Sequence, residues 1–469
     1  MQAKSPLKKW NTITQPINFQ SIMLRRKIEE ILLAWKEETN HKPIVIKGCR
    51  QCGKTFSVQK FAHDHYRHVV YLNFMLNPDY AIAFEGSKAI DDIIINISAM
   101  IPGSVFEPQQ TCLILDEIQE SAAARTALKF FKMDGRFDVI ATGSLLGVRG
   151  YGTRRYQSKE ESAKTSIPVG YETIVDMYPL DFEEFLWANG ITEPIINKVK
   201  ECLEQEKPVP EALHLRFRQL ILQYTVVGGM PAVVNIFIEK HNLGRVLQEQ
   251  RNIIAEYEDD MIKYANEADK PKIRECFESI PQQLSKENKK FQYSVVRKNS
   301  KASQYQGSLQ WIEDAGIICR CRNLNITELP LDGNSIPDSF KVYMADTGLF
   351  VAMLEDGTQF DILQGNLFGY KGAIFENLIA DIFTKMKRKL YYFRKDSGLE
   401  VDFVMRYKGE CVLVEVKAKD GNTKSTRTIL EHPEKYHVFH AIKLGDYNVG
   451  KKEALLTLPL YMAFLLRER

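Results

Sequence analysis

The chain has 469 residues, which is too long for one compact core, so about two to four domains are expected. Its 63 Lys and Arg residues nearly balance its 60 Asp and Glu residues, and the net charge of +3 excludes a strongly basic, nucleic-acid-binding composition. Residues 1–20 lack an apolar core segment, and no run of about 18 apolar residues occurs, so neither a signal peptide nor a membrane span is predicted. Eight cysteines do not predict a disulfide framework in a chain of this length, and a reducing cytoplasm is the expected location.

The first chemical motif follows a short apolar strand predicted at 44–46. The segment GCRQCGKT matches G-x-x-x-x-G-K-[ST], and a helix is predicted directly after it. Glycines let backbone N–H groups wrap around phosphates, and the helix N-terminus adds its dipole. Lys54 is expected to reach the β- and γ-phosphates, and the Thr55 hydroxyl to ligand magnesium. The residues predicted to contact nucleotide are Gly48, Cys49, Arg50, Gln51, Cys52, Gly53, Lys54, Thr55 and Phe56.

A second motif lies in TCLILDEIQE, where an apolar strand ends in two acids. A continuous apolar run is typical of a strand buried on both faces of a parallel sheet. Ligands bind at the carboxyl ends of such strands. Asp116 is therefore predicted to hold the magnesium of bound ATP, and Glu117 to orient and polarise the attacking water. The second acid favours hydrolysis over binding alone, whereas a solvated acidic turn is the alternative without function.

Two further features flank this site. The strand FDVIATGS ends in small polar residues, of which Thr142 is predicted to sense the γ-phosphate, with Ser144 in reserve. Such residues also serve as plain turn formers. Cys49 and Cys52 form a CxxC pair inside the glycine loop, which admits a redox or metal interpretation. No second Cys or His pair stands at a zinc-like spacing, so simple filling of the loop is the default.

Taken together, GCRQCGKT, LILDEIQE and IATGSLLG resemble an ATPase family of the AAA+ superfamily, on its archaeal-type, STAND-related side. Further matches are YPLDFEEFL, GGMPAVV, KVYMADTGL, GAIFENLI and EVDFV, so the resemblance covers nearly the whole chain. It implies an α/β fold with a P-loop ATPase core at 20–186, a parallel sheet, and ATP with Mg2+ as cofactors. Adenine is implied by the resemblance alone, because the phosphate motifs would accept GTP equally well.

One departure from that family concerns arginine. Many relatives carry a Gly-Arg pair before the PL-x-F-x-EF stretch, whereas here Gly170 is followed by Tyr171. An arginine that reaches the γ-phosphate from this point is therefore in doubt. Arg149, Arg154 and Arg155 in the preceding polar insert could substitute, although a charged insert is usually a solvated loop. Superfamily relatives often assemble so that a neighbour supplies the arginine, which leaves a homo-oligomer open.

The middle of the chain has two predicted parts. Residues 187–270 show helical periodicity and are expected to form a helical lid. Residues 271–335 resemble a winged helix, with Tyr305, Leu309 and Ile312 facing inward from its second helix, followed by the strand IICRCR. Contact with DNA and a simple packing role are both open for this segment. The residues that could meet phosphates are Lys289, Lys290, Arg297, Lys298 and Lys301.

Near the C-terminus, LEVDFVMRYKGECVLVEVKAK predicts two alternating strands around a Lys408–Gly409 turn. Like charges directly opposite each other destabilise a sheet unless solvent or a cation separates them. Carboxylate-rich sites suit magnesium or manganese. Counting outward from a two-residue turn gives the predicted pairs: Tyr407 with Glu410, Asp402 with Glu415, and Glu400 with Lys417.

This D…E-x-K arrangement resembles the PD-(D/E)xK restriction-endonuclease-like fold, and implies a C-terminal α/β nuclease-like domain at 336–469. The resemblance makes Asp402 and Glu415 metal ligands, Lys417 the catalytic lysine, and Glu376 a further acid from the preceding helix. Two alternatives stay open. A fold of this type can persist as a binding module without nuclease activity, and acid–lysine alternation also occurs on strands without function.

Two functions from different classes follow. The leading hypothesis is a cytoplasmic ATPase whose nucleotide state controls a nuclease-like region acting on DNA or RNA. The alternative is a regulatory switch that binds a protein or nucleic acid without cutting it. A small-molecule kinase is disfavoured because Glu117 is placed to activate water.

Overall fold

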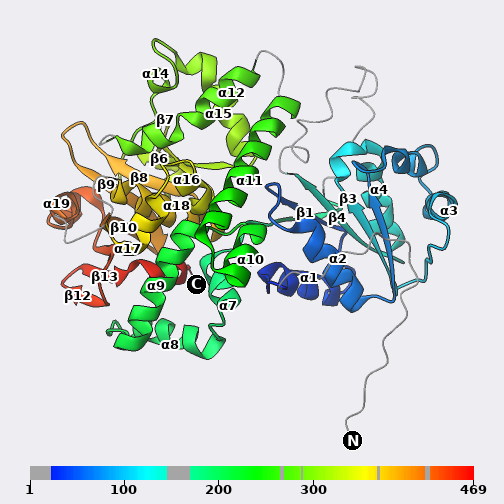
Figure 1. The fold of residues 1–469 in the computed structure, drawn as a ribbon, viewed down its shortest axis with the longest axis horizontal. Helices are drawn as coiled ribbons and strands as arrows, with labels where there is room; N and C mark the ends of the chain where they lie inside the picture. The colour runs from blue at the N-terminus through cyan, green and yellow to red at the C-terminus, as the bar shows by residue number, and fades with distance from the viewer. Residues whose placement is uncertain are drawn as a thin grey trace, which may run out of the picture. The chain divides into compact units, whose positions relative to one another are not determined.

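The computed structural model describes residues 23–144, 170–264, 269–286, 289–366, 370–417 and 423–468. The chain divides into two compact units, Met1–Met177 and Tyr178–Arg469, which Figure 1 shows in blue to cyan and in green to red. The second unit contains the three segments predicted after residue 186. The boundaries predicted between those segments stay predictions. The arginines predicted as substitutes at 149, 154 and 155 lie outside the described residues.

The first unit contains a five-stranded parallel sheet, in the order β2-β3-β4-β1-β5. The strand β4 lies between the strand that leads into the glycine loop and the strand that ends in the acids. In chain order the elements are α1 (Lys27–Glu37), β1 (Ile44–Gly48), α2 (Lys54–His65), β2 (His68–Asn73), η1 (Pro78–Phe84), α3 (Ile90–Met100), β3 (Thr111–Asp116), η2 (Ile118–Glu120), α4 (Ala122–Asp134), β4 (Asp138–Ser144) and β5 (Thr173–Asp176).

Apolar side chains fill both faces of this sheet. Ile44 and Ile46 of β1 join a buried cluster with α1 and α2, whereas Val45 joins a second cluster with α3 and α4. Successive strand residues point to opposite faces, so a strand covered on both sides must be apolar throughout. All six residues of β3 are buried for this reason. The α/β fold and the parallel ATPase-type sheet are therefore confirmed.

The second unit begins with helices, several of which are visible in green in Figure 1. The helix α7 starts with a capping box between Asp181 and Glu184, each side chain bonding the other's backbone N–H. The helical structure predicted for 187–270 is confirmed, while its role as a lid stays a prediction. The helices are α7 (Phe182–Ala188), α8 (Glu193–Glu204), α9 (Glu211–Val227), α10 (Pro231–Lys240), α11 (Leu243–Tyr264), α12 (Lys270–Glu278), α13 (Ile280–Ser285), α14 (Tyr293–Val296) and α15 (Ala302–Asp314).

A mixed eight-stranded sheet follows, in the order β12-β13-β11-β10-β9-β8-β6-β7. Its elements are β6 (Ile318–Leu324), η4 (Leu331–Asn334), β7 (Ser335–Met344), α16 (Thr347–Ala352), α17 (Thr358–Gln364), α18 (Lys371–Lys385), β8 (Leu390–Arg394), β9 (Glu400–Tyr407), β10 (Glu410–Lys417), α19 (Lys424–Leu430), α20 (Pro433–Tyr436), β11 (His440–Gly445), β12 (Gly450–Lys452), β13 (Leu455–Pro459) and η5 (Leu460–Leu465).

The segment resembling a winged helix has the predicted helix and strand. Tyr305, Leu309 and Ile312 of α15 are buried as predicted. The strand β6 pairs with β7 in a hairpin, but its other edge pairs in parallel with β8. The hairpin is therefore continuous with the C-terminal sheet and does not form a separate sheet. An open strand edge favours such pairing because its N–H and C=O groups need partners.

Candidate functional site

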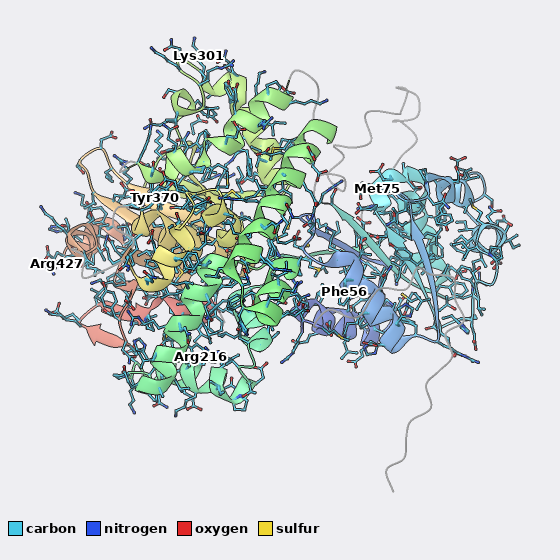
Figure 2. All side chains as sticks on the ribbon, viewed as in Figure 1. Phe56, Met75, Arg216, Lys301, Tyr370 and Arg427 are labelled. Atoms are coloured by element: carbon cyan, nitrogen blue, oxygen red, sulfur yellow. The ribbon has the colours of Figure 1, made fainter. Side chains whose placement is uncertain are left out.

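The glycine loop joins β1 to α2 by a tight path. A Cβ on Gly48 would lie 2.2 Å from the carbonyl oxygen of Met177, so no side chain fits there. Gly53 has φ 92° and caps α2, which begins at Lys54. Left-handed backbone of this kind favours glycine. Phe56, labelled in Figure 2, lies in the first turn of the helix. The glycines predicted from the motif thus stand where the backbone needs them.

Two buried cations hold the loop. The Lys54 ammonium donates to the carbonyl oxygens of Gly48 at 3.1 Å and Cys49 at 2.9 Å. The Arg26 guanidinium donates to the Cys52 carbonyl oxygen at 2.9 Å and is only 6% exposed. The role of Arg26 was not predicted, because nothing in the sequence links position 26 to a loop about one helix and one strand away.

The Asp116 carboxylate is the centre of the polar cluster at the end of β3. The Thr55 hydroxyl lies 3.2 Å from Oδ1 and 3.1 Å from Oδ2. The Thr142 hydroxyl, fully buried at the end of β4, donates to Oδ1, and the Glu117 N–H lies 3.2 Å from the same atom. The predicted residues Thr55, Asp116 and Thr142 are therefore brought together. Sensing of a γ-phosphate by Thr142 stays a prediction, as does the reserve role of Ser144.

Glu117 follows directly and has an unusual backbone. Its φ of 54° and ψ of 46° lie in the left-handed region, which costs free energy for a residue with a Cβ. Its carboxylate accepts a hydrogen bond of 2.5 Å from the Gln119 side-chain amide. The side chain is half-buried, in contrast to the buried Asp116. The two neighbouring acids thus have different surroundings, as their different predicted roles require.

The residues present fit a magnesium ion bound with ATP. A threonine hydroxyl and a carboxylate lie within about 3.2 Å of each other beside the loop lysine. Hard oxygen donors of this kind suit Mg2+, which in P-loop sites also keeps phosphate oxygens and water. Thr55 and Asp116 are the residues that would hold the ion.

Two donors to Asp116 come from β2 and were not predicted. The Tyr71 hydroxyl donates to Oδ2 at 2.7 Å, and the Asn73 amide donates to the same oxygen at 3.0 Å. The sequence identifies a core strand at this position but does not reveal that β2 lies next to β3. Strand order is set by packing of the whole sheet, so no local signal could have identified these two residues.

The two loop cysteines lie beneath the backbone. Both are buried thiols that are not part of a disulfide, with exposures of 6% for Cys49 and 0% for Cys52. A hydrogen bond from Cys49, together with the Lys54 and Arg26 charges, lowers the pKa of Cys52 to about 6 against the opposing effect of burial. The Cys52 side chain lies under the loop, with its Sγ 3.6 Å from the Met177 carbonyl oxygen.

The C-terminal hairpin has the predicted turn. Lys408 and Gly409 both have positive φ, and Tyr407 pairs with Glu410 as predicted. The pairing of β9 with β10 continues to Phe403 and Val414, and the Asp402 carboxylate accepts the Val416 N–H at 2.8 Å. The pairs predicted beyond this point, Asp402 with Glu415 and Glu400 with Lys417, stay predictions. On its other edge β9 pairs with β8, which sets Glu400 beside Arg394.

Lysines surround the acids of this hairpin. The fully buried Lys341 ammonium lies 2.9 Å from Glu400 and 3.8 Å from Glu376. Lys289, predicted to meet phosphates, instead forms an ion pair with Glu376, which also accepts the Tyr343 hydroxyl. Through these contacts, donors from β7 and from Lys289 surround the Glu376 carboxylate of α18.

The other two acids are held in the same way. The Glu415 carboxylate pairs with Lys417 at 2.6 Å and accepts the Thr426 hydroxyl. Burial, with the charges of Glu376 and Glu415, raises the pKa of Asp402 to about 7. Two buried carboxylates therefore discourage the third from ionising.

The acids predicted to hold a second metal ion are in contact with protein donors. Among the residues that the structure describes, no three His, Cys, Asp or Glu side chains are arranged to hold a metal ion. Lysines and hydroxyls contact Glu376 and Glu415. The ligand set of Asp402, Glu415 and Glu376 and the catalytic role of Lys417 stay predictions.

Comparison with protein families divides the chain into three matches. Residues 40–186 match an AAA domain. With its parallel sheet and glycine loop, this part of the chain has a P-loop ATPase fold and is called the AAA domain after the family model that it matches. Residues 218–359 and 371–461 match two domains of unknown function, DUF8612 and DUF4143. No curated protein matches the sequence.

Several solved structures are distantly similar. The Walker-type ATPase PABY2304 of Pyrococcus abyssi has 12% identity and a TM-score of 0.41, over 71% of this chain and 96% of the ATPase. The Aeropyrum pernix ORC1 protein in complex with DNA has 9% identity and a TM-score of 0.27, over 73% and 93%. A STAND protein with a tetratricopeptide repeat sensor, PH0952 from Pyrococcus horikoshii, has 12% identity and a TM-score of 0.25, over 78% and 46%.

A membrane span was not predicted. None of the helices in the described ranges is long and apolar enough to cross a bilayer.

Proposed function

We propose that the AAA domain binds MgATP and hydrolyses it. The observation that carries the proposal is the contact of the Thr55 hydroxyl with the Asp116 carboxylate beside the loop lysine. These three side chains come from α2 and β3, at the edge of the sheet where ligands of parallel α/β domains bind. Oxygen donors and a cation at one loop match the needs of a magnesium-bound phosphate chain.

Each residue has a distinct part in this reaction. Lys54 neutralises the β- and γ-phosphates after exchanging its loop carbonyls for phosphate oxygens. Thr55 and Asp116 hold the magnesium that enters with ATP. Glu117 orients the attacking water and takes up its proton as the water adds to the γ-phosphorus, while the bond to the β–γ bridging oxygen breaks and ADP leaves. Thr142 lies next to Asp116 and is placed to report whether a γ-phosphate is present.

The C-terminal unit supports the function of a nucleotide-controlled switch that binds a protein or nucleic acid without cutting it. The observation that favours this over a nuclease is the pairing of Glu376 with Lys341 and Lys289, and of Glu415 with Lys417. Displacing a buried lysine to admit a metal ion would leave that cation unpaired, which costs several kcal/mol. A metal-dependent cleavage is therefore disfavoured at this cluster.

Phosphate release from ATP, with and without single- and double-stranded DNA, tests both parts. We expect magnesium-dependent release by the full chain, loss of it in Lys54→Ala, and retention in Lys60→Ala. Lys60 is a matched control because it lies on the same helix and pairs only with surface acids.

The DNA from the same reactions is examined on a gel. Intact DNA is expected in every reaction. Cleavage by the wild-type chain that disappears in Glu415→Ala would instead establish an active nuclease and contradict the switch. Absence of phosphate release and of nucleotide binding in the wild type would overturn the ATPase proposal itself.

A further inference from the structure

The edge strand β2 of the AAA domain ends beside the acid that would hold magnesium. The strand pairs in parallel with β3, and its register sets Asn73 directly next to Asp116. Tyr71 and Asn73 are two residues apart, so their side chains share one face of the strand. Val70 and Leu72 face the opposite side and join the apolar core there. The sheet thus presents two polar side chains from the second half of β2 to one carboxylate.

Three hydrogen bonds connect these groups. The Tyr71 hydroxyl and the Asn73 amide donate to Oδ2 of Asp116 at 2.7 and 3.0 Å, and the amide lies 3.1 Å from the Tyr71 oxygen. Hydrogen bonds to a charged group are about twice as strong as those between neutral groups. These hydrogen bonds from β2 therefore restrict the rotation of the Asp116 carboxylate.

The orientation of the Asn73 side-chain amide is set by the hydrogen bonds that its oxygen accepts. Its Oδ1 accepts the backbone N–H groups of Met75 at 3.0 Å and Leu76 at 2.8 Å. The oxygen must face these donors, so the NH2 group must face Asp116. Met75 is labelled in Figure 2, at the start of the turn that leaves β2.

We propose that Tyr71 and Asn73 are positioning residues for the magnesium step of the reaction, acting through Asp116. This inference rests on the proposed ATP function. The pair holds the carboxylate from its Oδ2 side, while Thr142 and the Glu117 N–H contact Oδ1 and Thr55 contacts both oxygens. Partners of this kind, one shell behind a metal-binding group, set its orientation and strengthen metal binding. Neither residue contacts the glycine loop in the described hydrogen bonds, so affinity for the phosphates themselves is expected to be independent of them.

The test compares nucleotide binding with Mg2+ and with EDTA. A fluorescent ATP analogue is titrated into the full chain and into Tyr71→Phe and Asn73→Ala, and Mg2+ is then titrated into the nucleotide complex. The concentration of Mg2+ at half-saturation is expected to rise about tenfold in each variant, with nucleotide affinity in EDTA unchanged. Tyr66→Phe is the matched control, because Tyr66 donates an equivalent bond of 2.6 Å to Asp138 at the start of β4. This control is expected to keep the wild-type Mg2+ dependence.

Two results would overturn the inference. Unchanged Mg2+ half-saturation in both variants would show that the pair has no effect on the ion. Equal loss of affinity in Mg2+ and EDTA, with a loss of thermal stability matched by Tyr66→Phe, would show a purely structural role. A wild-type chain that binds nucleotide in neither condition would instead refute the ATP function, and the inference with it.

Discussion

His41, Tyr66 and Asp138 form a cluster at the end of the strands opposite to the proposed nucleotide site of the AAA domain. His41 lies 2.9 Å from Asp138, which begins β4 and also accepts the Tyr66 hydroxyl. The hydrogen bond to Asp138 raises the pKa of His41 from its usual 6.5, against the opposing effect of burial. The imidazolium form is thus favoured in the folded domain, which ties the start of β4 to the segment before β1.

A pH dependence of stability follows from this pair. Because the folded pKa of His41 exceeds its unfolded value, the stabilisation is fully present below about pH 6.5 and is lost as pH rises through the folded pKa. Relative to His41→Gln, the wild-type AAA domain should have a higher unfolding temperature at pH 6 than at pH 9. Calorimetry at both values measures this difference. Asp138→Asn should remove it, and a difference that persists in this variant would contradict the assignment.

Among single residues, the sequence identified those whose type and spacing are required by nucleotide chemistry. It predicted Lys54, Thr55 and Asp116 because phosphate and magnesium chemistry demands those groups at fixed spacing. It did not identify Arg26, Tyr71 or Asn73, whose partners lie on other elements. Their contacts arise from strand order and helix packing, which local sequence does not encode.

Between elements, the second unit contains a close approach of two chain segments. A Cβ on Gly229, before α10, would lie 2.1 Å from the Leu180 carbonyl oxygen, and the Gly229 N–H donates to Asp346 at 2.7 Å. Asp346 also caps α16 through the Leu349 N–H. The buried Lys385 ammonium joins the cluster, 2.8 Å from Asp381. The GGMP and ADTGL sequences therefore form one packed junction.

Adding one methyl group at two glycines should have opposite effects. Gly229→Ala forces Cβ into backbone atoms and should destabilise the second unit by about 1–3 kcal/mol. Gly307→Ala adds a methyl group in open space on the exposed face of α15 and should stabilise by about 0.5–1 kcal/mol. Thermal unfolding of the two variants beside the wild type measures both shifts. Equal stability of the two variants would refute the packing account.

Predictability differed between elements as well. The Lys408–Gly409 turn fixed the first pair of the hairpin, because a two-residue loop dictates its register. The far pairs predicted for the same hairpin, Asp402 with Glu415 and Glu400 with Lys417, stay predictions, whereas the ion pair of Glu400 with the buried Lys341 was not predicted. Lys341 is distant in sequence, so counting from a turn could not identify it.

For the molecule as a whole, the chain consists of two compact units with separate sheets. The predicted nucleotide residues from Gly48 to Thr142 all belong to the first unit, and the lysine-paired acids all belong to the second. The sequence predicted this separation of sites through its motifs. It did not predict that β6 would share a sheet with β8, because the resemblance to a winged helix gave β6 to another segment.

Because the proposed nucleotide site lies in the first unit, MgATP should stabilise that unit selectively. Heating the full chain should give two unfolding transitions, and MgATP should raise only the one that belongs to the AAA domain. At about 100 times the dissociation constant, binding stabilises the bound unit by about 2.7 kcal/mol. Differential scanning calorimetry with wild type and Lys54→Ala measures the shift. An equal shift of both transitions, or a shift that survives in Lys54→Ala, would contradict this assignment.

The most direct test of the central claim separates ATP binding from hydrolysis. Glu117→Gln removes the group that is expected to activate water, but leaves Lys54, Thr55 and Asp116 in place. We expect this variant to bind MgATP with wild-type affinity. Its single-turnover hydrolysis rate should fall at least about 100-fold. Wild-type hydrolysis in Glu117→Gln would show that this acid does not activate water, and would contradict the proposed mechanism.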